Sequence, residues 1–231
     1  MDITKFKDIH KGEAMLLVGN GENLHLTPPE QFNYPSIGMN TIHRYEGWIP
    51  DYYVAIDRRV WHEFGEEIEK KFGDIPKFIP TPKMLRWRGK NFYRFRNRTG
   101  PLYPKGKENL WQEINEQTQI TWRNVMHVAI KLAYFMGANP ILIIGMQHKQ
   151  HNAMAHFWGD DEKMTPDSVP INNIFEGYKQ LVAGLHSHDV EIFNISQDTY
   201  VPDDVIPTAN AEDWYKKKRS KKSWQNKNDQ Q

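Results

Sequence analysis

Short runs of apolar residues alternate along this chain with segments in which apolar residues recur every three or four positions. The clearest run covers residues 14–18 and leads into the turn Gly19-Asn20-Gly21, and a second run covers residues 140–145. Continuous apolar runs of this length, ending in turn residues, are typical of strands that are buried on both faces of a parallel sheet. Both runs therefore predict buried strands.

The same patterns predict the other regular elements. Shorter strands are expected at residues 35–39, 52–56, 77–79 and 190–194. Helical spacing of apolar residues predicts helices over residues 58–72, 120–136 and 174–186. Because strands that alternate with helices form α/β folds, we expect a Rossmann-like architecture, an open, mostly parallel sheet with helices on both faces.

Residues 83–118 fit neither pattern and are rich in basic and aromatic side chains, among them Arg94, Arg96 and Arg98. We predict a short strand plus loops here, which form a basic aromatic insertion or flap in a single α/β domain of residues 1–215. Residues 216–231 are rich in lysine, asparagine and glutamine and have no apolar periodicity. We expect a disordered basic tail that is solvated or, alternatively, makes a nonspecific contact with nucleic acid.

Composition narrows the function classes. The chain of 231 residues has 30 Lys and Arg against 29 Asp and Glu, so no overall field attracts it to nucleic acid or to an anionic membrane. It has no cysteine, which excludes disulfides, thiolate metal sites and cysteine nucleophiles. No apolar stretch approaches the about 18 residues of a membrane span, and residues 1–8 lack the apolar core of a signal peptide. We therefore expect a cytoplasmic protein.

The first candidate site follows the first strand. In open parallel sheets, ligands bind beyond the carboxyl ends of the strands, and glycines there let the backbone turn tightly and approach a phosphate. Gly19, Asn20 and Gly21 hold this position, and a structural turn without a ligand is the alternative. The dinucleotide pattern G-x-G-x-x-G is absent because Leu24 stands in place of the third glycine, and the P-loop pattern is absent too.

Further candidates come from other predicted strand ends and from a histidine-rich segment. Asn40 and Asp57 each end a predicted strand, and Asp57 could bind a ribose hydroxyl or a metal ion, or cap the helix that follows it. The later segment contains His148, His151 and His156. Histidine suits a metal site or acid/base chemistry near neutral pH, but this spacing matches no zinc signature, and an exposed loop is the third interpretation.

Five pieces of sequence, taken in order, carry a resemblance to known proteins. They are GNGENL at residues 19–24, GMN at 38–40, PDYYVAID at 50–57, AIKLAYFMG at 129–137 followed by ILIIG at 141–145, and HFWG at 156–159. In this order they resemble the bacterial CMP-sialic acid-dependent sialyltransferases and the wider group around them. That group includes motility-associated proteins, 6-hydroxymethylpterin diphosphokinase-like proteins and many phage proteins, and we expect a phage-encoded member.

The resemblance implies a glycosyltransferase that moves a sugar from a nucleotide-sugar donor, of the CMP type, to a hydroxyl acceptor without a metal ion. His156 would be the general base, because an imidazole that titrates near neutral pH can remove a hydroxyl proton. Arg94, Arg96 and Arg98 would contact the departing phosphate or form a lid. The nucleotide would be held by Gly19, Asn20, Gly21, Asn40, Asp57, Gly145 and Gln147.

The chain departs from the family pattern at three places. Glu22-Asn23 replaces Pro-Ser, Val125-Met126 replaces a Ser-Gly pair, and Gln147 replaces an aspartate at a strand end. Three alternatives therefore stay open. They are an ATP- and magnesium-dependent diphosphokinase-like phosphotransferase with Asp57 as a ligand, a non-catalytic nucleotide-binding or interaction protein, and a nucleic-acid-associated enzyme that uses the arginines and the basic tail.

Overall fold

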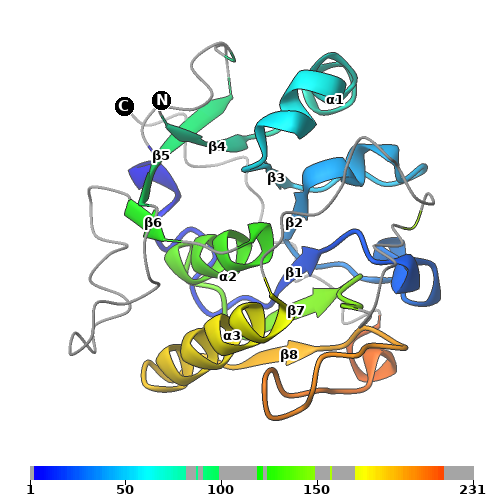
Figure 1. Ribbon diagram of the computed structural model, residues 1–231, viewed down its shortest axis with the longest axis vertical. Coiled ribbons are helices and arrows are strands. Elements are labelled where there is room, and N and C mark those ends of the chain that lie inside the picture. The colour runs from blue at the N-terminus through cyan, green and yellow to red at the C-terminus, as the bar shows by residue number, and fades with distance from the viewer. Residues whose placement is uncertain are drawn as a thin grey trace, which may run out of the picture.

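The structure is a computed structural model that describes residues 3–81, 87, 91–98, 119–121, 124–148, 157 and 170–215. In this part of the chain, eight strands form one sheet in the order β6-β5-β4-β3-β2-β1-β7-β8 (Figure 1). Every neighbouring pair of strands is parallel. The expected open, parallel α/β sheet is therefore confirmed.

The direction in which strands are added to the sheet reverses once, beside β1. From β1 the chain adds β2 to β6 on one side and then returns to add β7 and β8 on the other. The point between β1 and β7 is therefore the topological switch point, where open α/β sheets bind ligands. The strands are β1 (Met15–Val18), β2 (Ser36–Met39), β3 (Tyr52–Val54), β4 (Lys77–Thr81), β5 (Phe92–Arg98), β6 (Gln119–Thr121), β7 (Ile141–Ile144) and β8 (Ile192–Asn194).

Helices cover both faces of the sheet, as predicted. The helices α2 (Val125–Phe135) and α3 (Ile171–His186) lie next to each other over one face, and α1 (Arg58–Phe72) covers the other (Figure 1). Successive strand residues point to opposite faces, and each face of β1 packs into its own apolar core. Short 3₁₀ helices complete the two layers, namely η1 (Thr4–Phe6), η2 (Glu22–Leu26), η3 (Pro29–Gln31), η4 (Asn40–Arg44) and η7 (Ala211–Trp214).

The bounds of α1 match the prediction because side chains satisfy both ends of the helix. At its start, Asp57 accepts a hydrogen bond from the Arg59 backbone N–H at 2.8 Å. At its end, the buried ammonium of Lys77 donates to the carbonyl oxygens of Phe72 at 2.8 Å and of Gly73 at 3.1 Å. Burial lowers the pKa of Lys77, but three backbone acceptors, the third on Ile75, keep the group hydrogen-bonded.

The helix predicted over residues 120–136 begins later than expected. Residues 119–121 instead form β6, which pairs with the last three residues of β5. The helix α2 starts after Asn124, whose side chain accepts from the His127 backbone N–H at 3.0 Å while the His127 ring accepts from the Asn124 N–H at 3.1 Å. This reciprocal capping box sets the start of the helix, so the prediction was wrong for its first turn.

The short strand expected within residues 83–118 is β5, and it belongs to the main sheet. Its apolar side chains Phe92, Tyr93 and Phe95 are buried. Trp87 of this segment is also described, and its ring lies 5.3 Å from that of Trp61 in α1. The rest of the predicted flap and the basic tail of residues 216–231 lie outside the described residues.

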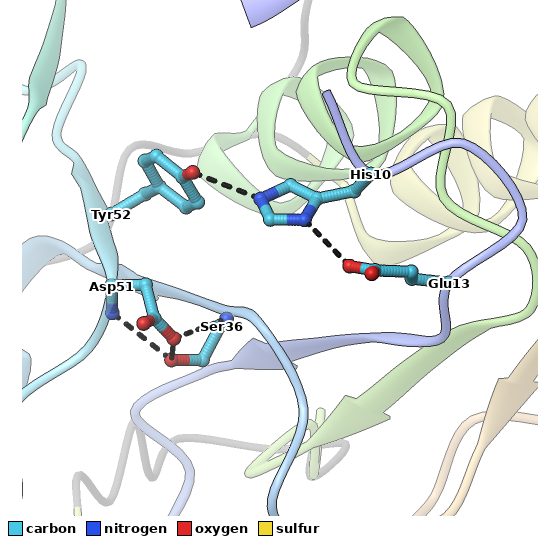
Figure 2. A network of polar contacts seen from close by, with 5 residues as sticks. All are labelled: His10, Glu13, Ser36, Asp51 and Tyr52. Carbon is cyan, nitrogen blue, oxygen red and sulfur yellow. Dashed lines mark hydrogen bonds and ion pairs between the residues drawn. The ribbon is translucent and has the colours of Figure 1, made fainter. Parts of the chain in front are cut away.

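A polar network ties the N-terminal segment to the amino ends of β2 and β3 (Figure 2). The buried His10 ring contacts the Glu13 carboxylate and the Tyr52 hydroxyl, each at 2.9 Å. Nearby, Asp51 accepts from the backbone N–H and the hydroxyl of Ser36, both at 2.9 Å. Because these residues lie just before β1 and β3 or begin β2 and β3, the network lies at the opposite edge of the sheet from the switch point and fixes the N-terminal segment in place.

Candidate functional site

The turns after β1 and β7 meet at the switch point. Gly19 donates its backbone N–H to the Ile144 carbonyl at 2.9 Å, and Gly21 donates to the Gly145 carbonyl at 2.8 Å. A Cβ on Gly19 would lie 2.4 Å from the Gly145 oxygen, and Gly145 itself has a φ of +65°. The two backbones therefore touch only because these positions carry no side chain, and both glycine N–H groups are already used within the protein.

Two asparagine side chains lie at this same edge with unused acceptor atoms. Asn20 donates its side-chain N–H to the Met39 carbonyl at 3.0 Å, which identifies its Oδ1 as the remaining atom of the amide. Oδ1 of Asn20 and Oδ1 of Asn40 are both buried, and neither has a hydrogen-bond partner among the residues that the structure describes. A buried acceptor left without a partner costs about 1–3 kcal/mol, so such atoms mark places where a ligand or water binds.

A loop that follows β8 packs against the turns after β1 and β7. Asn23 donates to the Gln197 carbonyl at 2.6 Å, Gln147 donates to the Asp198 carboxylate at 3.3 Å, and Tyr200 donates its backbone N–H to the Gln147 carbonyl at 2.9 Å. Asn23 and Gln147 are two of the positions at which the chain departs from the sialyltransferase pattern. In this protein, the two side chains hold the loop of residues 197–200 beside the candidate site.

His148 follows the same turn and faces α3. Its Nε2 lies 3.2 Å from the Tyr178 hydroxyl, which also accepts from the Asn124 side-chain N–H at 2.7 Å. Burial lowers the pKa of His148 to about 4, so its ring is neutral at pH 7. This connection joins the end of β7 to the start of α2 and could not be read from the sequence.

Two sets of predicted residues are not brought to the switch point. Asp57 lies after β3, two strands from β1, and its carboxylate both caps α1 and binds the Arg59 guanidinium at 2.6 Å. The arginines belong to β5, four strand spacings of about 4.8 Å from β1. The Arg94 guanidinium donates to the Trp87 carbonyl at 2.6 Å. The capping alternative for Asp57 is therefore confirmed, whereas a phosphate contact by Arg94, Arg96 and Arg98 stays a prediction.

Most of the histidine-rich segment, including His151 and His156, lies outside the described residues. Phe157, which directly follows His156 in the chain, is described. Its backbone N–H donates to the Asn20 carbonyl at 3.2 Å, and its ring packs edge-on against Tyr45 at 5.4 Å. Within the ranges that the structure describes, no three His, Asp or Glu side chains are grouped so that they could hold a metal ion.

The helical turn η4, which carries Asn40, is supported by a buried histidine. The His43 ring lies 3.4 Å from the Glu67 carboxylate and 5.5 Å from the Phe64 ring. Burial lowers the pKa of His43 from its ordinary 6.5 to about 4, although Glu67 partly opposes this shift. The imidazole is therefore kept neutral in the folded protein at neutral pH.

The depressed pKa of His43 makes the stability of the protein depend on pH. Below pH 6.5 the unfolded chain binds a proton at His43 that the folded protein does not bind until about pH 4. The free energy of unfolding should therefore fall as the pH drops from 6.5 to 4, by about 2–3 kcal/mol from this residue. Urea unfolding at several pH values should show a shallower dependence in His43→Gln, and an unchanged slope would contradict this explanation.

The fold has matches among solved structures. The sialyltransferase CST-II in complex with a trisaccharide acceptor and CMP is 11% identical, with 86% of this chain and 87% of that chain covered and a TM-score of 0.51. A variant of CST-II in complex with CMP is 10% identical over 86% of this chain and 87% of that chain, with a TM-score of 0.50. CstII from Campylobacter jejuni in complex with cytidine-5'-monophosphate is 11% identical over 87% and 86%, with a TM-score of 0.48.

The chain thus has a sialyltransferase-like fold. No protein-family model and no curated protein matches its sequence. The matches support the sialyltransferase part of the resemblance and give no support to a diphosphokinase-like relative or to a phage origin. None of the helices in the described ranges combines the length and the apolar character needed to cross a bilayer.

Proposed function

We propose that this protein is a metal-independent glycosyltransferase that moves a sugar from a nucleotide-sugar donor, of the CMP type, to a hydroxyl acceptor. The observation that carries the proposal is the pair of buried amide oxygens on Asn20 and Asn40, which have no hydrogen-bond partner in the described part of the chain. Oxygen atoms of this kind can only accept hydrogen bonds, so the ligand that satisfies them must present donors. A nucleotide does so through its ribose hydroxyls and its base amino group.

The solved neighbours support this choice of ligand. They share the fold with this chain, and their descriptions name CMP and a trisaccharide acceptor. The binding mode that we propose is built on side-chain amides rather than on a phosphate cradle, because the N–H groups of Gly19 and Gly21 are bonded to the carbonyls of Ile144 and Gly145. Gly145 and Gln147 then shape the site, Gly145 by its close backbone contact and Gln147 by its hold on Asp198.

In this proposal His156 is the general base that removes the proton of the acceptor hydroxyl. Support comes from its chain neighbour Phe157, whose backbone N–H is bonded to the carbonyl of Asn20. As the general base, His156 would have to come within hydrogen-bond reach of the acceptor hydroxyl. The imidazole is suited to this role because its ordinary pKa lies near neutral pH.

The surroundings of Asp57, the metal ligand in the phosphotransferase alternative, do not support that alternative. Asp57 uses its carboxylate for the cap of α1 and for the Arg59 guanidinium. A non-catalytic nucleotide-binding protein would show the same amide oxygens, and it differs from the transferase only in turnover. Turnover is therefore the property that separates the two interpretations.

The test is an assay for nucleotide release from CMP-, UDP- and GDP-sugars with a trisaccharide acceptor and EDTA. The proposal predicts release of CMP and formation of a glycosylated product without metal. Turnover of ATP that requires magnesium would support the phosphotransferase. Binding of CMP without release from any of the sugar donors would support the non-catalytic alternative and contradict the proposal.

Removing the Asn40 amide should weaken nucleotide binding without weakening the fold. Asn40 has a φ of +47°, so glycine, which adopts this conformation freely, is the suitable replacement. Because the described residues offer Oδ1 of Asn40 no hydrogen bond, we expect Asn40→Gly to change the free energy of unfolding by less than about 1 kcal/mol. The affinity for CMP should fall about tenfold, as for the loss of one hydrogen bond.

Thermal-shift titration with CMP measures both quantities. The exposed Asn33 offers a matched control, since Asn33→Gly makes the same chemical change away from the switch point. Equal affinities of Asn40→Gly and Asn33→Gly would contradict a ligand-binding role for Asn40. A large loss of stability in Asn40→Gly alone would show that the amide supports the fold instead.

A further inference from the structure

We propose that His148 binds the nucleotide in this site as a neutral hydrogen-bond donor, with its Nδ1–H directed to an oxygen of the ligand. This inference rests on the proposed function, because it assigns a further binding residue to the same site. It is carried by the placement of His148 at the end of β7 and by a chain of hydrogen bonds that determines which ring nitrogen holds the proton.

His148 lies where a residue can reach a ligand at the switch point. It comes four residues after the end of β7, where Ile144 pairs with Val18 of β1. The turn from Ile144 to His148 is bonded to β1's turn, because the Gly21 N–H donates to the Gly145 carbonyl. The φ of His148 is +51°, in the left-handed region that non-glycine residues seldom occupy, although asparagine, aspartate and histidine occupy it more often than the others. Non-glycine residues held in such a conformation are found preferentially at functional sites.

The direction of the hydrogen bonds can be followed from Asn124. Its side-chain N–H donates to the Tyr178 hydroxyl at 2.7 Å, so that oxygen acts as an acceptor there. The hydroxyl is fully buried and its own hydrogen needs an acceptor. Nε2 of His148, at 3.2 Å, is the acceptor that the described contacts provide. Nε2 therefore carries no hydrogen, and the ring proton is on Nδ1.

Nδ1 has no hydrogen-bond partner among the described residues. The donor is nevertheless held in one orientation, because the ring packs edge-on against Phe175 at 5.9 Å and at a tilt against Tyr178 at 5.8 Å. Tyr178 in turn packs 4.4 Å from His127, a member of the capping box that starts α2. A donor whose direction is set before binding loses little conformational entropy when the ligand arrives.

Burial keeps both partners of this contact neutral. It lowers the pKa of His148 to about 4 and raises the pKa of Tyr178 above its usual value. At pH 7 the phenol thus keeps the hydrogen that it donates, and the imidazole keeps a single N–H. The Nδ1–H of His148 adds a donor to the accepting amide oxygens of Asn20 and Asn40. A nucleotide complements this set, since its hydroxyl and amino groups donate and its phosphate and carbonyl oxygens accept.

Two substitutions at position 148 distinguish the effect of the hydrogen-bond donor from the effect of the backbone conformation. Glycine and asparagine both tolerate the positive φ of residue 148, so His148→Gly and His148→Asn place the same demand on the backbone. The asparagine amide N–H stands close to the position of Nδ1, whereas glycine offers no donor. We expect His148→Gly to bind CMP about tenfold more weakly than the wild type and His148→Asn to stay within about threefold of it.

A third variant, Tyr178→Phe, removes the hydrogen that Nε2 accepts without touching the ligand. Nitrogen-15 NMR of the imidazole reports which ring nitrogen carries the proton. The wild type should show the Nδ1–H form before CMP is added and a shift of that N–H resonance afterwards. Tyr178→Phe should show a mixture of the two neutral forms and a weaker affinity for CMP.

The outcomes distinguish this inference from the proposed function. An Nε2–H ring in the free wild type would overturn the inference whatever the protein binds. If CMP binds the wild type and His148→Gly with equal affinity and leaves the His148 resonances unchanged, the inference fails and the proposed function stands. If CMP does not bind the wild type, both fail together.

Discussion

Replacing Gly19 with alanine is expected to lower the free energy of unfolding by about 3 kcal/mol, within the range of severe core substitutions. The added Cβ would lie 2.4 Å from the Gly145 oxygen and 3.1 Å from its carbonyl carbon. Both are backbone atoms of the turn that follows β7, so neither can move aside like the end of a flexible side chain. The β1–β7 contact would have to open, and urea unfolding would measure the loss.

Gly47→Ala is the matched control for this substitution. Gly47 has a φ of +77°, but nothing lies within 4 Å of the position that its Cβ would take. It should therefore show only the strain of a left-handed alanine, about 1 kcal/mol. If Gly19→Ala is no less stable than Gly47→Ala, the close packing of the two turns is not what requires glycine after β1.

Replacing His156 with alanine is expected to abolish most of the transfer reaction while CMP binding is kept. General-base catalysis contributes about 10²–10⁴-fold to such reactions, so kcat should fall by that factor. In the proposed mechanism, the base acts on the acceptor hydroxyl and holds no part of the nucleotide. The dissociation constant for CMP should therefore change less than about threefold, as measured by calorimetry next to the assay of product formation.

His151→Ala provides the comparison for His156→Ala, because it removes another histidine from the same segment. It should keep at least about half of the wild-type rate, a change too small to reflect the loss of a general base. Wild-type activity in His156→Ala would refute its role as the base. A parallel loss of activity in both variants would point to the segment as a whole rather than to one side chain.

The central elements of the fold were predictable because their signals are local. The apolar run before Gly19 is β1, buried on both faces, and the range of α1 agrees to the residue with residues 58–72. That helix has its cap Asp57 and its closing Gly73 within its own sequence. Patterns of this kind report short-range geometry directly.

The elements at the far edge of the sheet were harder to predict because their stability comes from distant pairing. Gln119–Thr121 is too short to show a period, and it becomes a strand only through its ladder with β5. In the sequence, the basic residues of β5 interrupt the apolar pattern of its buried aromatic side chains. Asn124, a residue type that favours helix N-caps, was the available signal for the true start of α2.

At the candidate site, position along the strands predicted which residues come together, but not how they are bonded. Asn20 and Asn40 do lie at adjacent strand ends. However, the Gly19 and Gly21 N–H groups bind the carbonyls at and just after the end of β7, which lie more than 120 residues away in the sequence. Local sequence patterns likewise cannot predict the contact between Asn23 and Gln197, which are 174 residues apart.

The measurement that tests the nucleotide site most directly is a calorimetric titration of CMP into the wild-type protein in EDTA, repeated with Asn40→Gly. We predict saturable binding with one CMP per chain that needs no metal and is about tenfold weaker in the variant. The absence of binding in the wild type, or equal binding by both proteins, would contradict a nucleotide site at the switch point.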